Sequence, residues 1–322
     1  LAMLKPWETT GMAVVQAESE TASINMLYGG GGSGKRVFTT SSSPGIALMQ
    51  EGISYMAGAE IPGVIVNVQR GGPGLGTIQP SQGDYFQATR GGGNGDYKVI
   101  VLAPDSVQEM ADFMDLAFEL AFRYRNPVMI LSDGVIGQMM EKVVLPPQKP
   151  RLSDEEVMRK YPWASFGRVG GRKPNIITSL ELKPEVMEER NIHLQKKYQE
   201  CKEKETRCET IMMDDAEYAV VAFGSMARIA EKAVELAREN GIKAGLFRPI
   251  TLWPFPDKQI ADLCNHCKGI LVAEMNAGQM IDDVRLAVNG RVPVKHYGRQ
   301  GGIVPDPSEI EEELNKLRNY AK

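Results

Sequence analysis

Several features that define common functional classes are scarce or absent in this sequence of 322 residues. No apolar run approaches the length of about 20 residues that a membrane-spanning helix needs, so we expect no membrane insertion. Lys and Arg (37 residues) are outnumbered by Asp and Glu (41), and the net charge of −4 predicts no general attraction to nucleic acid. We find no signal peptide and expect a cytoplasmic protein, with an N-terminal piece missing because the chain begins at Leu1 rather than Met.

Cysteine is also scarce, with four residues in the whole chain. Cys264 and Cys267 have the C-x2-C spacing of zinc and iron–sulfur ligands, whereas Cys201 and Cys208 have a C-x6-C spacing that fits neither. A single C-x2-C pair is a weak signal of a metal site. We therefore expect free thiols, no metal site in this chain, and any electron-carrying cluster on another chain.

Glycine, by contrast, is abundant, with 33 residues. The stretch Gly29–Lys35 matches the G-x4-G-K part of a phosphate-binding loop. The next residue is Arg36 instead of Ser or Thr, and the stretch runs from a predicted helix into a predicted strand, the reverse of what the motif requires. We predict a close-packed helix end or turn here instead of a phosphate site.

Strand and helix patterns alternate in both halves of the chain, which predicts parallel sheets covered on both faces. The first set of strands is expected at residues 12–16, 36–40, 63–68, 99–102 and 128–131, and the second at 219–223, 243–247, 270–272 and 292–296. We predict an α/β fold with three parts. These are a domain at residues 1–145, an extended connector at 146–210 and a smaller α/β domain at 211–322.

Two charged residues follow predicted strands of the first domain. Glu20 comes after the run at 12–16 and begins a helix, and Arg70 follows the strand at 63–68. Open α/β folds bind ligands at the carboxyl ends of their strands, and a guanidinium can grip a carboxylate with two parallel hydrogen bonds. Taken singly, each residue is more commonly a first-turn Glu or a surface Arg. Together they predict a carboxylate and an anion clamp in one crevice.

Two further segments accompany this pair. Ser41-Ser42-Ser43-Pro44-Gly45 ends the intervening strand, where small hydroxyl residues either line a pocket or cap the following helix, and both alternatives stay open. The glycine-rich segment 70–96 is longer than loops in compact domains usually are, which favours a functional role.

The chain resembles the pyrimidine-binding alpha subunit of 2-oxoacid:ferredoxin oxidoreductases, closest to the 2-oxoisovalerate (3-methyl-2-oxobutanoate) branch. The resemblance is carried by Gln16–Glu20, Thr40–Gly45, Gln50–Gly52, Arg70–Gly74, Gln82–Asp84, Asn126–Leu131 and Glu274–Met280. It implies a pyrimidine-type domain of thiamine diphosphate enzymes with a parallel sheet, followed by a smaller domain like the C-terminal domain of transketolase.

This resemblance also implies how the cofactor is shared. Thiamine diphosphate would lie between two chains, with its aminopyrimidine on this chain and its diphosphate and Mg²⁺ on a beta subunit. The Gly-Asp-Gly…Asn motif for the diphosphate is absent here, and Ser132-Asp133-Gly134 is the nearest match. By the same resemblance Glu20 is the catalytic residue at N1′ of the pyrimidine. The remaining cofactor contacts would come from Ser42, Ser43, Pro44 and Gly45.

The implied substrate and partner contacts lie in the glycine-rich segment. Arg70 would bind the substrate carboxylate, and the loop at the partner interface would contain Gly71, Gly72, Pro73, Gln82 and Asp84. The Gly-Pro-Ser-Thr-Gly of the 2-oxoglutarate type is replaced by Gly72-Pro73-Gly74-Leu75-Gly76, which favours an apolar substrate side chain. The family's Gly-Tyr-Pro-Ile-Thr-Pro stretch, whose Thr contacts substrate, has no match here.

The implied reaction is oxidative decarboxylation of a 2-oxoacid to an acyl-CoA and CO₂. Ferredoxin would receive the electrons through 4Fe–4S clusters on gamma and ferredoxin-like delta subunits. Three alternatives stay open: a pyruvate or 2-oxoglutarate enzyme of the same family, half of a non-oxidative thiamine-dependent lyase or transferase, and a regulatory subunit without catalysis.

Overall fold

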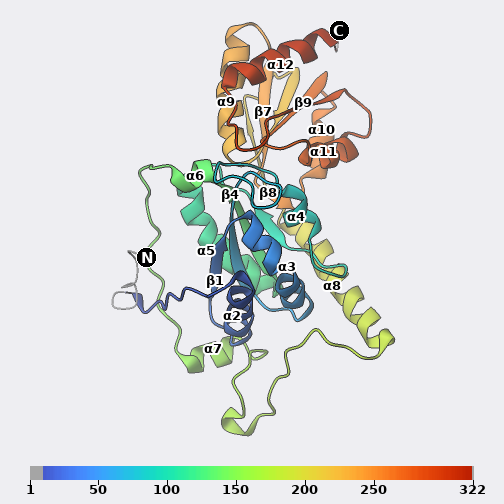
Figure 1. Cartoon of the computed structure of the whole chain (residues 1–322). Coiled ribbons are helices and arrows are strands. Elements are labelled where there is room, and N and C mark those ends of the chain that lie inside the picture. The colour runs from blue at the N-terminus through green and yellow to red at the C-terminus, as the bar shows by residue number, and fades with distance from the viewer. Residues whose placement is uncertain (1–9, 321–322) are drawn as a thin grey trace.

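Two five-stranded sheets organise the computed structural model, which describes residues 10–320. Figure 1 shows them one above the other, each with its own helices, and the C-terminal end of the chain lies at the far end of the upper unit. The α/β fold with parallel sheets predicted from the sequence is confirmed.

The first sheet has the order β1-β2-β4-β3-β8, and its first four strands are parallel. The four parallel strands are β1 (Phe38–Ser41), β2 (Gly63–Gln69), β4 (Pro127–Asp133) and β3 (Ile100–Leu102). The fifth strand, β8 (Thr251–Trp253), is antiparallel to β3. The chain moves one way across the sheet from β1 to β2 and back the other way from β3 to β4. Because β–α–β crossovers are right-handed, the two connecting helices, α3 (Ser43–Gly58) and α5 (Val107–Tyr124), cover opposite faces. All residues of β4 are buried, as expected for a strand covered on both faces.

The second sheet has the order β10-β9-β6-β7-β5, parallel except for β5. Its strands are β10 (Val294–Gly298), β9 (Gly269–Glu274), β6 (Tyr218–Val221), β7 (Ala244–Pro249) and β5 (Cys208–Ile211). Its helices are α9 (Gly224–Glu239), α10 (Asp257–Leu263), α11 (Met280–Val288) and α12 (Pro307–Tyr320). The pair α9 and α12 packs together on one face, opposite α10 and α11 (Figure 1).

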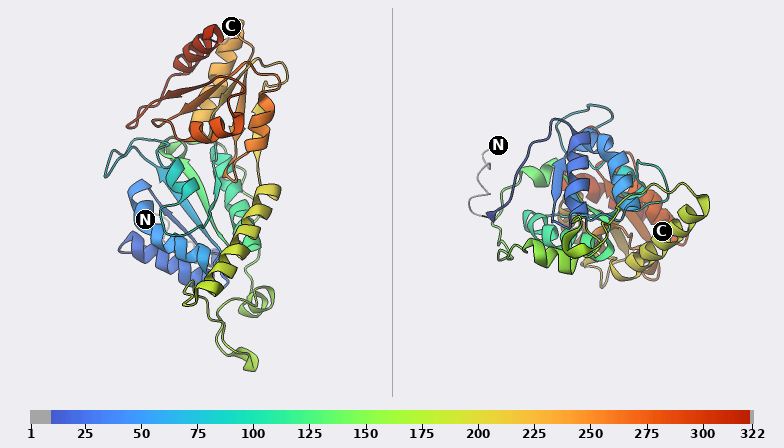
Figure 2. Two further views of the ribbon diagram at one scale, coloured as in Figure 1. Left: turned by 90° about the vertical axis from the view of Figure 1, so that its right-hand side faces the viewer. Right: turned by 90° about the horizontal axis from the view of Figure 1, so that it is seen from below.

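The segment between the sheets is long and runs along the first unit (Figures 1 and 2). After α6 (Gly134–Gln138) it descends to α7 (Asp154–Lys160) and the short 3₁₀ helix η1 (Val169–Gly171), and then α8 (Pro184–Lys204) returns towards the second unit. Tyr198 of α8 packs edge-on against Trp253 of β8. Since β8 joins the first sheet although it follows β7 in the chain, the two units share an element. The predicted boundaries at 145 and 210 stay predictions.

Two expectations about the N-terminal region have different outcomes. The strand predicted at 12–16 is wrong, because this segment has no regular structure and Val15 is 68% exposed. An apolar run becomes a strand only where a neighbouring strand accepts its hydrogen bonds, and β1, at the sheet edge, pairs with β2 alone. The helix end predicted at Gly29–Lys35 is confirmed. Helix α2 (Glu20–Gly32) continues to Gly32, and Gly31 packs directly on the carbonyl of Pro62.

The two units are also joined by charge. Arg248 of β7 is buried and makes a two-pronged ion pair with Glu109 in the first turn of α5, with N–O distances of 2.7 and 2.8 Å. Asp105 and Glu209 lie 3.2 and 2.8 Å from the same guanidinium. No described helix is both long and apolar enough to cross a membrane.

Candidate active site

Glu20 is the first residue of α2. The Ser19 side chain caps this helix by accepting a hydrogen bond from the backbone N–H of Ala22 at 3.2 Å. A carboxylate in the first turn is stabilised by the partial positive charge of the helix N-terminus. Thus Glu20 is held at a defined place although the strand expected before it is absent.

Glu20 lies directly against Gly45. A methyl group built on Gly45 would lie 2.8 Å from Glu20 Cγ and 3.0 Å from Glu20 Oε1, and would also overlap the Ser41 hydroxyl. Only glycine leaves room for the carboxylate at this point. The structure therefore brings Glu20 together with the carboxyl end of β1 and the start of α3.

Ser42 and Ser43, at the start of α3, make different contacts. Ser42 occupies the N-cap position of α3 without a capping hydrogen bond from its side chain. Ser43 instead contacts the backbone of Arg70, where its hydroxyl accepts from the Arg70 N–H at 3.1 Å and donates to the Arg70 carbonyl at 3.3 Å. Pro44 is at the second helical position. Hence the start of α3 links the end of β1 to the end of β2.

Arg70 follows β2 and is partly buried. Its Nε is buried and has no hydrogen-bond partner among the described residues. Buried polar groups are normally hydrogen-bonded, so this guanidinium nitrogen is a donor that remains available to a ligand. Because the guanidinium is always charged and offers paired donors, that ligand is best an anion such as a carboxylate.

Asp84 completes the corner from the other end of the glycine-rich segment. Its carboxylate accepts from Asn67 Nδ2 at 2.9 Å, and its backbone N–H donates to Gln69 Oε1 at 3.0 Å. Burial raises the pKa of Asp84, and hydrogen bonds from Ser43 and Asn67 offset part of that effect. Asp84 therefore faces inward beside Ser43 instead of lying on the loop surface.

Gln82 lies elsewhere than the sequence suggested. It is 0% exposed and bonds to residues of the second unit within the same chain. This placement corrects the expectation that Gln82 belongs to a surface that another chain covers. A fully buried residue has no area to offer a partner, and polar residues in a predicted loop do not reveal this internal contact.

The residues between Arg70 and Gln82 form a projecting loop. Gly71 packs on Gly301 and Gly302 of the second unit, whereas no described residue lies within 4 Å of the position that a Cβ on Gly72 would take. Leu75 at the tip is 81% exposed, and Ile78 is 76% exposed. Leu75 consequently lines no pocket formed by this chain alone.

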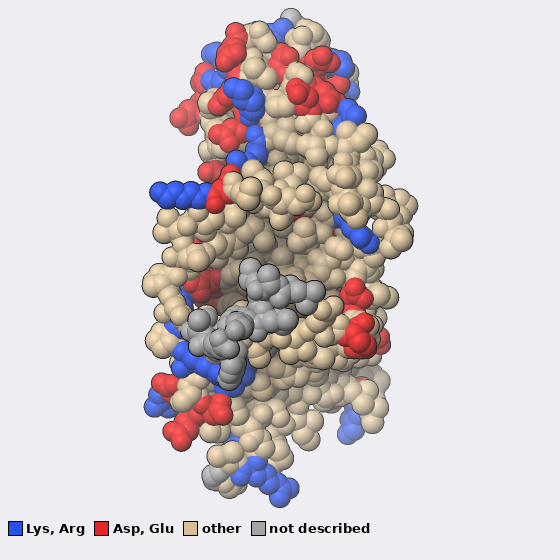
Figure 3. Space-filling model, turned by 60° about the vertical axis from the view of Figure 1, so that its left-hand side comes forward, with Lys and Arg blue, Asp and Glu red and all other residues tan. Residues whose placement is uncertain are grey.

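Figure 3 shows a face of the molecule on which charged side chains gather towards the two ends. The band between them is hollowed and mostly uncharged. A hollow, largely uncharged band of this kind suits contact with another protein better than contact with a highly charged ligand.

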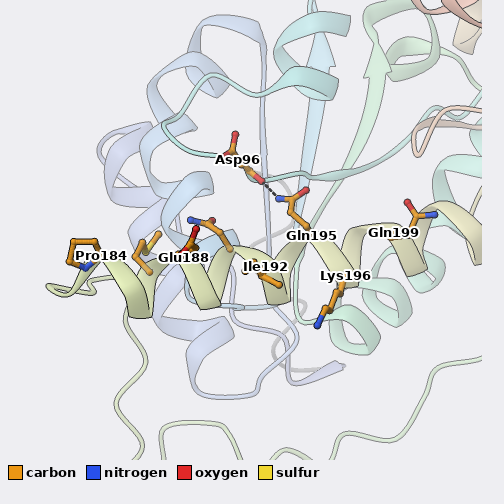
Figure 4. Close-up of a pocket in the computed structure, with 9 residues that line it drawn as sticks. Asp96, Pro184, Glu188, Ile192, Gln195, Lys196 and Gln199 are labelled. Carbon is orange, nitrogen blue, oxygen red and sulfur yellow. Dashed lines mark hydrogen bonds between the residues drawn. The ribbon is translucent and has the colours of Figure 1, made fainter.

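A groove of about 760 Å³ lies along α8 and is separate from the Glu20 corner. Figure 4 shows Gln195 reaching from α8 to the backbone of Asp96, to which its amide donates at 2.8 Å, while Lys196 points away. Asp96, at the end of the glycine-rich segment, lines this groove, but none of the residues predicted to contact cofactor or substrate does. Its size alone does not make it the active site.

The segment most like a diphosphate motif has structural partners within the chain. Asp133 is buried and caps α6 by accepting from the N–H groups of Val135 and Ile136. It also accepts from the Ser225 hydroxyl at 2.5 Å. With its oxygens engaged in this way, the Ser132-Asp133-Gly134 stretch does not fit a diphosphate–Mg²⁺ site.

The cysteines have no metal-ligand geometry within the described residues. Cys267 is buried beside the carbonyl of Ala216, and burial raises the pKa of its thiol to about 11. A protonated, buried thiol is a poor nucleophile and a poor metal ligand.

Sequence reasoning missed Asn67 and Gln69, which support Asp84 from within β2. Both are buried polar residues in an otherwise apolar strand. The signal was present, since Asn and Gln are rare inside a parallel strand unless hydrogen-bonded. It points towards the site because both residues lie near the carboxyl end of β2.

Comparisons with known proteins show the family of the chain. Residues 2–212 match the family model described as "Pyruvate flavodoxin/ferredoxin oxidoreductase, thiamine diP-bdg", and residues 216–310 match "Pyruvate:ferredoxin oxidoreductase core domain II". The chain is 48% identical over 313 residues to the ketoisovalerate oxidoreductase subunit VorB of Methanothermobacter thermautotrophicus, covering 97% of this chain and 86% of that protein.

Two solved structures are similar. The 2-oxoglutarate:ferredoxin oxidoreductase from Magnetococcus marinus, with 2-oxoglutarate, coenzyme A and succinyl-CoA bound, has a TM-score of 0.77 at 25% identity. The match covers 98% of this chain and 59% of that one. A split-gene transketolase, described as an inactive beta4 tetramer, has a TM-score of 0.60 at 12% identity over 100% of this chain and 91% of its own, which shows the fold alone. The chain thus belongs to the 2-oxoacid:ferredoxin oxidoreductase family, as a subunit that contains its thiamine diphosphate-binding domain.

Proposed function

We propose that the chain is the pyrimidine-binding subunit of a 2-oxoisovalerate:ferredoxin oxidoreductase. In this reaction 2-oxoisovalerate, coenzyme A and two oxidised ferredoxins yield isobutyryl-CoA, CO₂, two reduced ferredoxins and a proton. The observation that carries the proposal is the corner where Glu20 lies against Gly45 and Ser43 bonds to Arg70, whose buried Nε has no partner among the described residues. The 48% identity to a ketoisovalerate oxidoreductase subunit supports the substrate.

Glu20 and Gly45 fit the aminopyrimidine end of thiamine diphosphate. When bound, this cofactor would supply a nucleophilic carbon and an electron sink for the decarboxylation. Glu20 holds a proton at N1′ of the pyrimidine, and Gly45 keeps the space beside the carboxylate free. Glu20 is half-buried in this chain, and a second chain that covered it would strengthen such a hydrogen bond by excluding competing water.

Arg70 binds the carboxylate of the 2-oxoacid. Ser43 fixes the Arg70 backbone through two hydrogen bonds, so that the guanidinium starts from a defined position. A bidentate guanidinium–carboxylate pair orients the substrate as well as attracting it. The exposed Leu75 lies at the tip of the loop that follows Arg70. Once a second chain covers this loop, Leu75 suits the apolar side chain of 2-oxoisovalerate.

A beta subunit would hold the diphosphate and Mg²⁺, and gamma and ferredoxin-like delta subunits would carry the 4Fe–4S clusters. The engagement of Asp133 inside this chain supports the assignment of the diphosphate to another chain. The exposed Leu75 and Ile78 support a protein partner at this loop. The cytoplasmic location stays a prediction.

The proposal is tested with the native complex under anaerobic conditions. Viologen reduction is followed with coenzyme A, thiamine diphosphate and Mg²⁺, comparing 2-oxoisovalerate, pyruvate and 2-oxoglutarate. The expected result is coenzyme A-dependent reduction that is fastest with 2-oxoisovalerate. Faster reduction with another acid overturns the substrate assignment, and coenzyme A-independent turnover supports a non-oxidative enzyme instead.

Site variants in the same complex test the two roles. Glu20→Gln is expected to lower kcat by roughly 10²-fold or more, since it removes a proton-transfer group. Arg70→Met is expected to raise KM for the 2-oxoacid by about 30-fold, or about 2 kcal/mol, without raising KM for coenzyme A. Arg159→Met on the surface helix α7 is the control and should behave as the wild type. An active complex with Glu20→Gln would favour the regulatory-subunit alternative.

A further inference from the structure

Gln82 makes the densest set of polar contacts between the two units of this chain. Its side chain donates to the Phe223 carbonyl at 2.7 Å and accepts from the Met275 N–H at 3.1 Å. Its backbone donates to the Met275 carbonyl at 3.0 Å and accepts from Asn276 Nδ2 at 2.8 Å. All four bonds go to residues that closely follow the carboxyl ends of β6 and β9.

Gln82 is connected to Arg70 through the short segment of chain that ends at Pro80. Arg70 pairs with Pro80 as an antiparallel bridge, and the Gly71 N–H donates to the Gln79 carbonyl at 2.9 Å. Pro80 is two residues from Gln82. The loop between Arg70 and Pro80 is therefore a closed hairpin, and the position of its base depends on where Gln82 is held.

The second unit contacts the same hairpin from another side. Gly302, which follows β10, packs so closely on Gln79 that a methyl group built there would overlap the Gln79 Cβ and lie 3.2 Å from Thr77 Cγ2. Gly301 beside it has nothing within 4 Å of its own methyl position. Two separate segments of the second unit thus bear on the hairpin that begins at Arg70.

We propose that the second unit sets the position of the anion-binding arginine, with Gln82 as the positioning residue. The proposal rests on the function proposed for Arg70. A guanidinium binds a carboxylate in two-pronged fashion only over a narrow range of positions, so a small displacement of the hairpin weakens substrate binding. In this proposal the second unit does not touch the substrate itself. It acts through Gln82 and Gly302 on the loop.

The test compares Gln82→Met with Tyr85→Phe in the intact complex. Met has a similar length but forms neither side-chain hydrogen bond. Tyr85 is a matched control, since its hydroxyl also joins the two units, donating to Asp283 at 2.7 Å, but lies on α4 (Tyr85–Arg90) after the hairpin. KM for the 2-oxoacid should rise about tenfold in Gln82→Met, which corresponds to about 1.4 kcal/mol. KM for coenzyme A, and both constants in Tyr85→Phe, should stay within about twofold.

A second readout does not depend on turnover. In hydrogen–deuterium exchange of the intact complex, amides of residues 71–79 should exchange about tenfold faster in Gln82→Met and unchanged in Tyr85→Phe. Equal changes in both variants would show that Gln82 acts only by holding the units together, and would overturn the proposal. If exchange rises selectively but no 2-oxoacid is turned over by the wild type, the loop contact stands and the proposed function fails.

A glycine pair keeps the test decisive if Gln82→Met does not assemble. Gly302→Ala pushes on Gln79, whereas Gly301→Ala adds a methyl group to open space, and both positions have positive φ angles of 97° and 65°. The expected result is a raised KM for the 2-oxoacid in Gly302→Ala alone. The same KM in the two variants would contradict the role of the second unit.

Discussion

At the scale of single residues, the site depends on the absence of a side chain as much as on Glu20 and Arg70. Gly45 is the third residue of α3 and lies where Glu20 and Ser41 approach the backbone. The space that a Cβ would take is occupied by the Ser41 hydroxyl and by the side chain of Glu20, whose carboxylate the proposed reaction uses. A glycine in the first turn of a helix costs little conformational stability compared with one in the middle, so this position tolerates it.

Gly45→Ala is therefore expected to displace Glu20 and to lower kcat by roughly 10²-fold, because small misplacement of a reacting group has effects of this size. The measurement is the anaerobic viologen assay of the assembled complex. Gly29→Ala is the control, since nothing lies within 4 Å of its added methyl group. Turnover of Gly45→Ala within twofold of the wild type would show that Glu20 does not need its present position.

At the scale of elements, α2 combines the Glu20 end with a run of four glycines at its other end. Glycine is a poor helix former, and the helix continues through them because of close packing. Gly30 lies against Val37, and Gly31 against Ile61 and the Pro62 carbonyl just before β2. The glycine run thus allows α2 to approach the backbone that leads into the central strands.

Two alanine variants separate propensity from packing in this helix. Gly29→Ala, with free space around the added methyl group, should raise the free energy of unfolding by about 0.5–1 kcal/mol. Gly31→Ala should lower it by about 1–3 kcal/mol, because the methyl group overlaps the Pro62 carbonyl. Thermal unfolding of the two variants beside the wild type gives the order of the midpoints. A midpoint for Gly31→Ala above that of the wild type would contradict the packing described for α2.

At the scale of the whole molecule, the two units are joined at Gln82, at β8 and at the buried Arg248. Burial and the neighbouring Glu109 carboxylate raise the pKa of Asp105 to about 6, although Arg248 acts in the opposite direction. The same guanidinium keeps the pKa of Glu109 below its ordinary value, against the effect of burial. One carboxylate of the pair therefore stays charged while the other holds a proton in mildly acidic solution.

The pKa of Asp105 predicts a pH dependence with a definite sign. Between about pH 4 and pH 6 the folded chain holds a proton that the unfolded chain, with the ordinary value of 3.8, has released. Stability contributed by this group thus falls as the pH rises through this window. Asp105→Asn should raise the unfolding midpoint of the complex at pH 8 and give a smaller gain at pH 5. A variant less stable than the wild type at pH 8 would mean that the charged Asp105 is net stabilising beside Arg248.

The pattern of the chain predicted most of the elements and singled out Glu20, Arg70 and the segment 41–45, for physical reasons. Apolar periodicity located β2, β4 and the helices between them, because burial on two faces leaves a clear trace in sequence. The strand predicted at 12–16 was wrong, since an apolar segment does not reveal by itself whether another strand pairs with it. Asp84 and Gln82, two residues apart, have similar composition around them but face different neighbours, one the Arg70 corner and one the second unit.

The sequence by itself determined the α/β class, the parallel sheets and the family, because these follow from periodicity and from short motifs read along the chain. It also identified Glu20 and Arg70 as candidates. Only the tertiary structure decided that Glu20 rests on Gly45, that Ser43 holds the Arg70 backbone and that Gln82 is enclosed by β6 and β9. These are contacts between residues distant in the sequence, and their distances are set by how helices and sheets pack.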